Sequence, residues 1–382
     1  MASVMSFPTR ILYGKGAIKE LPAELKRVSV SRPLLVTDKG ILQAGLLRFI
    51  TPLLEQAGMK VQVFSEFEAN PTDADALRGI EAYRAAKADG VLGIGGGASL
   101  DMAKAIALLV NHPPPLAQYD DAKGGDARIT APVPPILQVP TTAGTGSEVG
   151  RSTVLVIEGT KTVIFSPALM AKAAILDPEL TVGLPPFITA ATGMDALTHN
   201  LEAYVAKGDH PLADAIAIDG LRRIATHLER AVRNGKDLEA REQMLLGSSF
   251  GAIAFQKGLG ACHSVAHALT PVAGTHHGLA NSLMLPAVVS FNRMAAEERL
   301  ATAAVALGAD PKMSVQERAH LCAELVDDLR GACGLPRRLS QAGVRREMIP
   351  KLVEKALADG CHQSNPRPVT EVDFERLINE AF

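Results

Sequence analysis

The side chains with the clearest metal chemistry in this sequence are one carboxylate and several imidazoles at helical spacing. Asp195 and His199 are four residues apart, and His263 and His267 repeat that interval. Residues four apart lie on one face of an α-helix, so each pair would present its polar atoms to the same side. His277 adds a further imidazole beyond a short break. One oxygen ligand and three nitrogen ligands suit a divalent transition metal such as Fe²⁺ or Zn²⁺.

Other interpretations of such residues stay open. A lone histidine is usually structural or solvated. His276 stands directly beside His277, and because adjacent residues do not easily face one ion, only one of the two is expected to be a ligand. Cys262 is more often a buried small residue than a ligand.

Upstream of these residues, two segments have the composition of phosphate-binding loops. Residues 93–101 (GIGGGASLD) follow an apolar strand-like run and open a helical stretch. Glycines there let the backbone approach a pyrophosphate, and the helix N-terminus supplies N–H donors. Residues 140–148 (PTTAGTGSE) also follow a strand-like run and offer hydroxyls with two glycines. A metal site combined with these loops predicts metal-assisted redox chemistry on a nucleotide cofactor, although a tight turn would explain either loop alone.

A further cofactor signal is a carboxylate at the end of a strand. Asp38 follows the apolar run 34–37, where its side chain could accept a hydrogen bond from a ribose 2′-hydroxyl and would repel a 2′-phosphate. The residue therefore favours NAD over NADP, with a simple turn through Asp38 as the alternative. Asp101 and Lys104 are similarly ambiguous, because they could be first-turn and surface charges of a helix.

The composition limits the class of protein. The chain has 382 residues, of which 47% are hydrophobic and 21% charged, which is typical of a globular protein with two domains. Its net charge of -2 gives no electrostatic reason to bind nucleic acid or an anionic membrane. The few scattered cysteines argue against a disulfide framework. No signal peptide or membrane-spanning run is evident, so we expect a cytoplasmic enzyme.

The predicted secondary structure that positions these residues changes near Pro185-Pro186, from alternating strands and helices to helices alone. Before this point, helical stretches such as 73–88 and 100–109 alternate with short β-type runs, an arrangement that predicts parallel strands covered on both faces. From Thr189, a good N-cap for the helix with Asp195, the chain is expected to be all-helical. We therefore predict an α/β dinucleotide-binding domain over 1–186 and an all-helical metal-binding domain over 187–382. The strand candidates are 34–37, 61–64, 90–94, 136–139, 154–157 and 174–176.

The motifs together resemble those of the iron-containing (group III) alcohol dehydrogenases. The likeness runs from about Tyr13 to the C-terminus, with Ala98 standing where many members have serine. It implies a Rossmann-like parallel sheet followed by a helical metal domain, as in the dehydroquinate synthase-like fold, with the active site in the cleft between them. The segments that carry it are 95–104 (GGGASLDMAK), 141–149 (TTAGTGSEV), 193–199 (GMDALTH), 257–267 (KGLGACHSVAH), 277–281 (HGLAN) and 365–367 (NPR).

The resemblance also implies roles for individual residues. The metal ligands would be Asp195, His199, His263 and His277, and His267 would lie near the nicotinamide and take part in proton transfer. Cys361 would line the substrate pocket. NAD and Fe²⁺ are the expected cofactors, with Zn²⁺ as an alternative ion, and a homodimer or larger homo-oligomer is expected. Together with Asp38, the cofactor contacts would come from Asn70, Gly96, Gly97, Ser99, Asp101, Thr141, Thr142, Thr145 and Lys161.

The sequence therefore predicts a metal-dependent, NAD-linked alcohol dehydrogenase or aldehyde reductase for a primary alcohol or hydroxy acid. Residues 255–260 and 361–366 resemble the 4-hydroxybutyrate dehydrogenase branch, and Arg151 could pair with an anionic head group. Arginine near this position also occurs in dehydrogenases of simple alcohols. Two other classes stay open. A metal-dependent lyase of the dehydroquinate synthase-like fold is disfavoured by the two loops, and an inactive binding protein is disfavoured by the complete ligand set.

Overall fold

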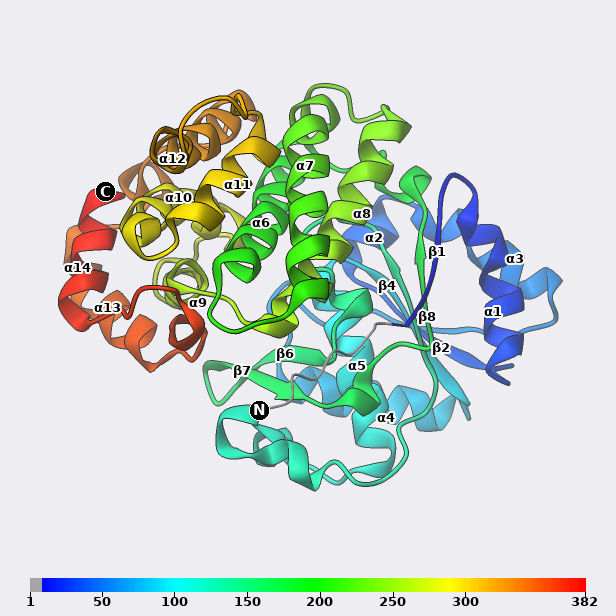
Figure 1. Ribbon diagram of the computed structural model, residues 1–382. Helices are drawn as coiled ribbons and strands as arrows, with labels where there is room; N and C mark the ends of the chain where they lie inside the picture. Colours follow the sequence, from blue (N-terminus) through cyan, green and yellow to red (C-terminus); the bar gives the residue numbers. More distant parts are fainter. Residues whose placement is uncertain (1–8) are drawn as a thin grey trace. The chain divides into compact units, whose positions relative to one another are not determined.

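The computed structural model describes residues 9–382, and its internal contacts divide the chain into two compact units (Figure 1). Among the described residues, one unit holds 9–142 together with Gly146–Gly183. The other holds Leu184–Phe382 together with Ala143–Thr145, a short piece of the second glycine-containing loop. The division of the chain into domains at 186/187 stays a prediction.

The first unit is built on a parallel sheet (Figure 1). The sheet has six strands in the order β1-β8-β5-β4-β2-β3. Strands β2, β4, β5 and β8 are buried along their whole length, as their largely apolar sequences predict. The expected α/β class is therefore confirmed. The strands are β1 (Arg10–Tyr13), β2 (Pro33–Val36), β3 (Gln62–Phe64), β4 (Gly90–Gly95), β5 (Ile136–Pro140) and β8 (Ala173–Leu176).

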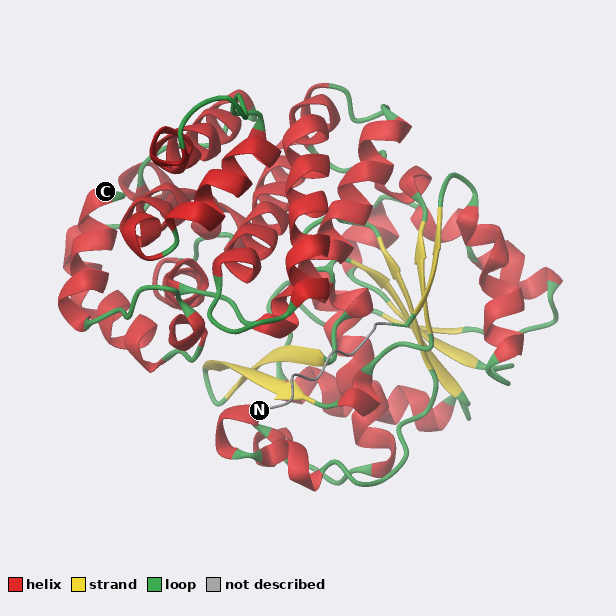
Figure 2. Cartoon of the chain, in the orientation of Figure 1, coloured by secondary structure: helices red, strands yellow, loops and turns green. Residues whose placement is uncertain are grey.

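Alternate residues of each strand pack into apolar clusters on opposite faces of the sheet. Leu34 of β2 belongs to a cluster shared with helices α4 and α5, whereas Leu35 belongs to a cluster shared with α1 and α3. Helices therefore cover both faces of the sheet (Figure 2). The helices of this unit are α1 (Leu21–Arg27), α2 (Lys39–Gln43), α3 (Thr51–Gln56), α4 (Asp73–Ala85) and α5 (Gly97–Asn111).

One expected strand lies outside this sheet. Residues 154–157 belong to β6 (Ser152–Ile157), which pairs antiparallel with β7 (Thr160–Phe165) as a separate hairpin. The chain turns through Glu158 and Gly159, which have positive φ values of 51° and 77°, as a tight two-residue hairpin turn requires. The prediction of a parallel strand here is therefore wrong. Strands β1 and β7 were not expected from the sequence.

The second unit is helical, as expected, and the described residues after Leu176 contain no strand. Helix α6 begins at Pro186 with Pro185 as its N-cap, so the prediction that Thr189 caps it is wrong. Proline is well suited to the first helical position, whereas the Thr189 hydroxyl lies inside the helix and accepts a hydrogen bond from Arg241 (2.8 Å). The helices are α6 (Pro186–Val205), α7 (Pro211–Arg233), α8 (Leu238–Ala254), α9 (Ala261–Ala273), α10 (His277–Asn292), α11 (Glu297–Leu307), α12 (Val315–Ala332), α13 (Ile349–Ala358) and α14 (Glu371–Glu380). Within the part of the chain that is described, no helix is both long and apolar enough to cross a membrane.

Candidate functional site

Three of the four expected metal ligands converge in the helical unit. Asp195 lies in the middle of α6, His263 lies near the start of α9, and His277 is the first residue of α10. Their ligand atoms lie within 4.8 Å of one another. Oδ1 of Asp195 is 3.4 Å from Nε2 of His277 and 3.8 Å from Nε2 of His263. Asp195 and His263 are buried, and His277 is partly exposed, so the cluster is accessible from one side.

The donor set fits a divalent transition metal. Burial opposes the ionisation of Asp195, but the neighbouring imidazoles of His199 and His277 hold the pKa of this carboxyl well below its usual range. The amide Nδ2 of Asn281 donates to Oδ1 of Asp195 (2.7 Å) and lies 3.3 Å and 3.2 Å from Nε2 of His263 and His277. Four polar side chains are thus directed at one point, and an ionised carboxylate oxygen beside imidazole nitrogens is a donor set for Fe²⁺ or Zn²⁺.

His199 follows Asp195 by one helical turn, but its ring nitrogens lie outside this three-residue group. Its ring stacks on that of His263 with 4.6 Å between centroids, and its Nδ1 is 3.3 Å from the carbonyl oxygen of Gly144. Burial lowers the pKa of His199 to about 4, so the ring is neutral near pH 7, which is the form that binds a metal. The role of His199 as a fourth ligand stays a prediction.

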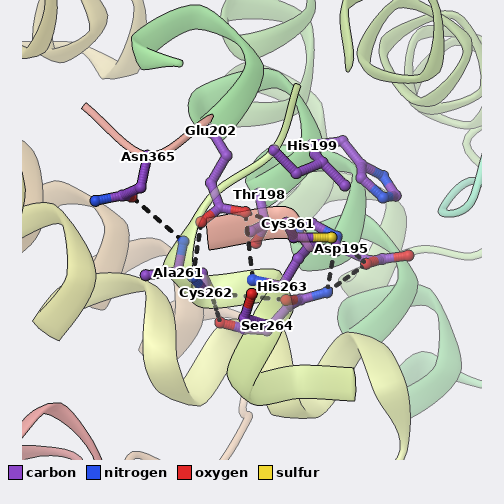
Figure 3. A network of polar contacts seen from close by, with 12 residues as sticks. Asp195, Thr198, His199, Glu202, Ala261, Cys262, His263, Ser264, Cys361 and Asn365 are labelled. Atoms are coloured by element: carbon purple, nitrogen blue, oxygen red, sulfur yellow. Dashed lines mark hydrogen bonds and ion pairs between the residues drawn. The ribbon is translucent and has the colours of Figure 1, made fainter. Parts of the chain in front are cut away.

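Glu202 is a buried acid that the sequence analysis missed (Figure 3). Its Oε2 accepts a hydrogen bond of 2.6 Å from Nδ1 of His263. This bond places the ring proton on Nδ1 and leaves Nε2 free to bind an ion, which is the usual arrangement of a carboxylate behind a metal-binding histidine. Although burial favours the neutral ring, the hydrogen bond to Glu202 raises the pKa of His263. Helical spacing could have identified Glu202, because it lies on the same face of α6 as Asp195 and His199.

The start of α9 is held by two side chains from distant parts of the chain (Figure 3). Its N-cap, Gly260, has no side chain to cap the helix. Oε1 of Glu202 instead accepts from the backbone N–H of Cys262 (2.7 Å), and Oδ1 of Asn365 accepts from that of Ala261 (3.3 Å). Asn365 belongs to the C-terminal NPR motif, so this motif positions the helix that carries His263.

His267 lies one turn after His263 on α9, and its ring stacks on that of His277 with 5.3 Å between centroids. Its ligand atoms group with those of Asp359 and Cys361 rather than with Asp195. Nδ1 of His267 is 2.8 Å from Oδ2 of Asp359 and 3.9 Å from Sγ of Cys361. This arrangement supports the expectation that His267 lies beside the three candidate metal ligands without being one of them. Asp359 was not identified from the sequence.

In the α/β unit, the two expected cofactor loops follow neighbouring strands. Strands β2, β4 and β5 are adjacent and parallel, so Thr37, Gly95 and Thr141 end them at the same edge of the sheet, where α/β folds bind their ligands. Helix α5 begins here, and its N-cap Gly96 makes no side-chain hydrogen bond, which leaves N–H groups for an anion. The hydroxyls of Thr37 and Thr141 are buried without a hydrogen-bond partner among residues 9–382. These features fit the diphosphate and ribose of a dinucleotide.

Asp38 lies at the same edge of the sheet and is half-buried. Its Oδ1 accepts from the backbone N–H of Ile41 (3.0 Å), so it caps helix α2. Its Oδ2 accepts from the hydroxyl of the fully buried Ser99 (2.8 Å). Asp38 therefore has a structural role in the turn between β2 and α2. Its contact with the ribose stays a prediction.

Asp101 and Lys104 hold the second loop rather than forming a surface pair. Lys104 is fully buried, and its Nζ donates to the carbonyl oxygens of Ser147 (2.7 Å), Gly150 (3.1 Å) and Ser152 (2.7 Å). The interpretation of Lys104 as a surface charge is therefore wrong, and burial lowers its pKa to about 8. The carboxylate of Asp101 accepts from the hydroxyl of Ser147 (2.6 Å). A contact of Asp101 with phosphate stays a prediction.

Several other expected cofactor residues make contacts within the α/β unit. Thr142 packs beside Gly96, at 3.5 Å from the position a side chain would take there. Burial raises the pKa of Asp101, and the nearby charge of Lys161 is one of the interactions that oppose this effect. Asn70 is exposed. The contacts proposed for these residues, and for Gly97 and Thr145, stay predictions.

Comparison with known proteins relates the whole chain to one family. The model of the iron-containing alcohol dehydrogenases matches residues 8–178, and that of the C-terminal part of the same family matches residues 189–382. A 4-hydroxybutyrate dehydrogenase from Cupriavidus necator is 41% identical, and an NAD-dependent methanol dehydrogenase from Bacillus methanolicus is 35% identical, with 98% of each chain covered in both cases. The crystal structure of a 1,3-propanediol oxidoreductase superposes with a TM-score of 0.96 at 35% identity over the full length of both chains.

Proposed function

Because this chain belongs to the iron-containing alcohol dehydrogenase family, we propose that it transfers hydride between NAD and a primary alcohol or hydroxy acid, in either direction. The convergence of Asp195, His263 and His277 carries this proposal. Fe²⁺ is the proposed ion, with Zn²⁺ as the alternative. The NAD dependence of the methanol dehydrogenase relative supports the choice of cofactor. Family membership favours this reaction over the lyase chemistry of related folds.

The residues of the protein would supply binding, alignment and proton transfer. When bound, the ion supplies Lewis acidity toward the substrate oxygen, and the nicotinamide exchanges the hydride. Glu202 keeps Nε2 of His263 directed at the ligand cluster. His267 takes up the proton that the alcohol loses in oxidation and returns it in reduction. The N-terminus of α5 and the Thr141 hydroxyl bind the diphosphate and ribose.

The direct test is an activity assay after anaerobic loading with Fe²⁺ or Zn²⁺. NADH formation would be followed with a panel of primary alcohols and hydroxy acids, and NADH consumption with the matching aldehydes. We expect activity that depends on the added ion and on NAD. An ion-loaded, NAD-binding protein that is inactive throughout the panel would instead indicate a binding protein.

Asp38 should determine the choice between NAD and NADP. The wild type is expected to favour NAD, and Asp38→Gly should narrow that preference by removing charge repulsion against the 2′-phosphate. Glycine at an N-cap costs only a few tenths of a kcal/mol relative to aspartate. The buried hydroxyl of Ser99 also loses its acceptor, at a cost of about 1–3 kcal/mol, so the variant should be less stable but still folded. The measurement is kcat/KM for each cofactor.

A matched control for this variant is Asp237→Gly. Asp237 caps helix α8 by accepting a hydrogen bond of 3.0 Å from the backbone N–H of Ala240, three residues on, as Asp38 does from Ile41. This control should leave the cofactor preference unchanged. A wild type that prefers NADP would remove Asp38 from the cofactor site.

An ω-hydroxy acid is the substrate class that we propose beside simple alcohols, because the 4-hydroxybutyrate dehydrogenase shares 41% identity with this chain. The guanidinium of Arg151 lies 5.0 Å from the ring centre of Phe165, and it is the candidate partner for the distal carboxylate. A hydrogen bond to a charged group contributes about 1.5–3 kcal/mol. Arg151→Met should therefore raise KM for 4-hydroxybutyrate by roughly 10–100-fold while leaving that for 1-butanol little changed.

Arg48→Met is the control for Arg151→Met, because the guanidinium of Arg48 also lies over an aromatic ring, that of Phe49, at 4.8 Å. The control should change neither KM. If Arg151→Met changed KM equally for 4-hydroxybutyrate and for 1-butanol, Arg151 would have a structural role. It would then not be the residue that recognises the carboxylate of a hydroxy acid.

A homodimer or larger homo-oligomer and a cytoplasmic location stay predictions. The molecular mass of the purified protein in solution would test the first, and fractionation of the producing cells would test the second.

A further inference from the structure

The imidazole of His267 is bound to a carboxylate far away in the sequence. Asp359, the C-cap residue of α13, accepts a 2.8 Å hydrogen bond at Oδ2 from Nδ1 of His267, although 92 residues separate them. Both side chains are about three-quarters buried, with exposed fractions of 21% for Asp359 and 25% for His267. The pair lies beside the candidate metal ligands, because the ring of His267 stacks on that of His277.

The carboxylate of Asp359 is itself held in place. Its Oδ1 accepts from the hydroxyl of Ser264 (2.9 Å) and from the backbone N–H of Cys361 (2.9 Å). Ser264 lies one turn before His267 on α9, and its oxygen also accepts from the backbone N–H of His362 (2.9 Å). Burial opposes the ionisation of Asp359, but the hydrogen bond from His267 and these donors hold the pKa of the carboxyl well below its usual range. An ionised acceptor thus occupies a fixed position behind the ring.

We propose that Asp359 is a positioning residue, which binds the Nδ1 proton of His267 and thereby fixes Nε2 as the atom that exchanges a proton with the substrate. This inference rests on the proposed function, in which His267 transfers that proton. A carboxylate behind a histidine orients the ring and selects one of its two tautomers. Without the carboxylate, the ring of His267 would rotate, or would carry its proton on Nε2 instead of Nδ1, for part of the time. Nε2 would then be ready to accept a proton from fewer of the bound substrate molecules.

The same side chains also suggest a second metal site, since the ligand atoms of His267, Asp359 and Cys361 lie within 4.8 Å of one another. The chemistry of the cluster favours the hydrogen-bonded pair instead. Nδ1 of His267 donates its proton to Oδ2 of Asp359 at 2.8 Å, so this nitrogen has no lone pair to offer an ion. Both oxygens of Asp359 also already accept hydrogen bonds.

The test is a double-mutant cycle on the metal-loaded enzyme with Asp359→Asn, His267→Ala and the double variant. Asparagine has nearly the same shape as aspartate but lacks its charge. For a histidine that binds a metal, loss of the partner behind the ring typically costs ~10–100-fold in metal affinity or activity. We expect Asp359→Asn to lower kcat by about the same factor, with KM, metal content and NAD affinity little changed. In the His267→Ala background the same substitution should have almost no further effect, because the two residues act as a unit.

Several outcomes would overturn the inference. An equal fall of kcat in both backgrounds would show that Asp359 only supports the structure, and loss of bound metal in Asp359→Asn would indicate a metal ligand. If His267→Ala lowers kcat while Asp359→Asn does not, the inference fails and the proposed function stands. If His267→Ala has no effect, proton transfer by His267 fails as well.

Two further variants guard against a folding defect. Asp237→Asn, at the cap of α8, should leave kcat unchanged. Should Asp359→Asn not fold, Ser264→Ala removes one donor to the carboxylate, and it should give a smaller fall in kcat that again disappears in the His267→Ala background. A Ser264→Ala variant whose kcat equals that of the wild type would then overturn the inference.

Discussion

Replacement of Asp195 or His263 by alanine is expected to abolish activity and to remove the bound ion. Oδ1 of Asp195 faces Nε2 of both His263 and His277 within 4 Å, so either change deletes a donor at the centre of the cluster. Changing a residue that merely orients a ligand costs ~10–100-fold in metal affinity or activity, and deleting the ligand itself should cost more. Metal analysis of the purified variants, together with NADH formation, measures both effects.

The control for these variants is His320→Ala, because His320 is a largely exposed histidine, with a side chain 65% exposed, that pairs with Glu324 outside the cluster. It should retain full metal content and activity. If Asp195→Ala or His263→Ala kept both as well, that residue would not be a ligand, and the site would need a different donor set.

His267→Ala should separate proton transfer from metal binding. Its ring lies against His277 but outside the three-residue ligand group, so the variant should keep its metal and its NAD affinity while kcat falls. General acid–base catalysis typically contributes ~10²–10⁴-fold, and a decrease of that size is expected. The measurements are kcat, metal content and NAD titration on one preparation.

Two results would contradict this role for His267. Loss of the ion would make His267 a ligand and would require a new assignment for His263 or His277. An unchanged kcat would show that the proton leaves by another route, such as water. Added imidazole provides a further check, because it should partly restore kcat only if a missing proton acceptor limits the reaction.

The local elements and the residue types of the site could be predicted from the sequence. Apolar runs such as 90–94 become buried parallel strands because nothing polar interrupts them. The interval of four between His263 and His267 places both rings on one side of α9, because an α-helix repeats every 3.6 residues. The glycine-rich segment opens α5 at the end of β4, as its position after a strand predicts. In each case the signal lies within a few residues of the feature.

Errors arose where local patterns left two solutions equally good. The run 154–157 has the composition of a buried strand, but a tight turn at Glu158-Gly159 pairs it with the next strand instead. Threonine is a good N-cap, yet Pro185-Pro186 starts α6 earlier and leaves Thr189 inside it. The sequence leaves a surface position open for Lys104, because no local pattern shows that the carbonyl oxygens of Ser147, Gly150 and Ser152 enclose its ammonium group.

By itself, the sequence determined which candidate ligands, loops and helix faces this protein has, because composition and periodicity act over short stretches of chain. Only the tertiary structure decided the partners of those residues. It brought Glu202 to His263 across 61 residues and Asp359 to His267 across 92, and it turned the ring of His199 toward Gly144. The physical reason is that a buried polar group must find its hydrogen-bond partner wherever the packing of the helices places one, and no local pattern encodes that packing.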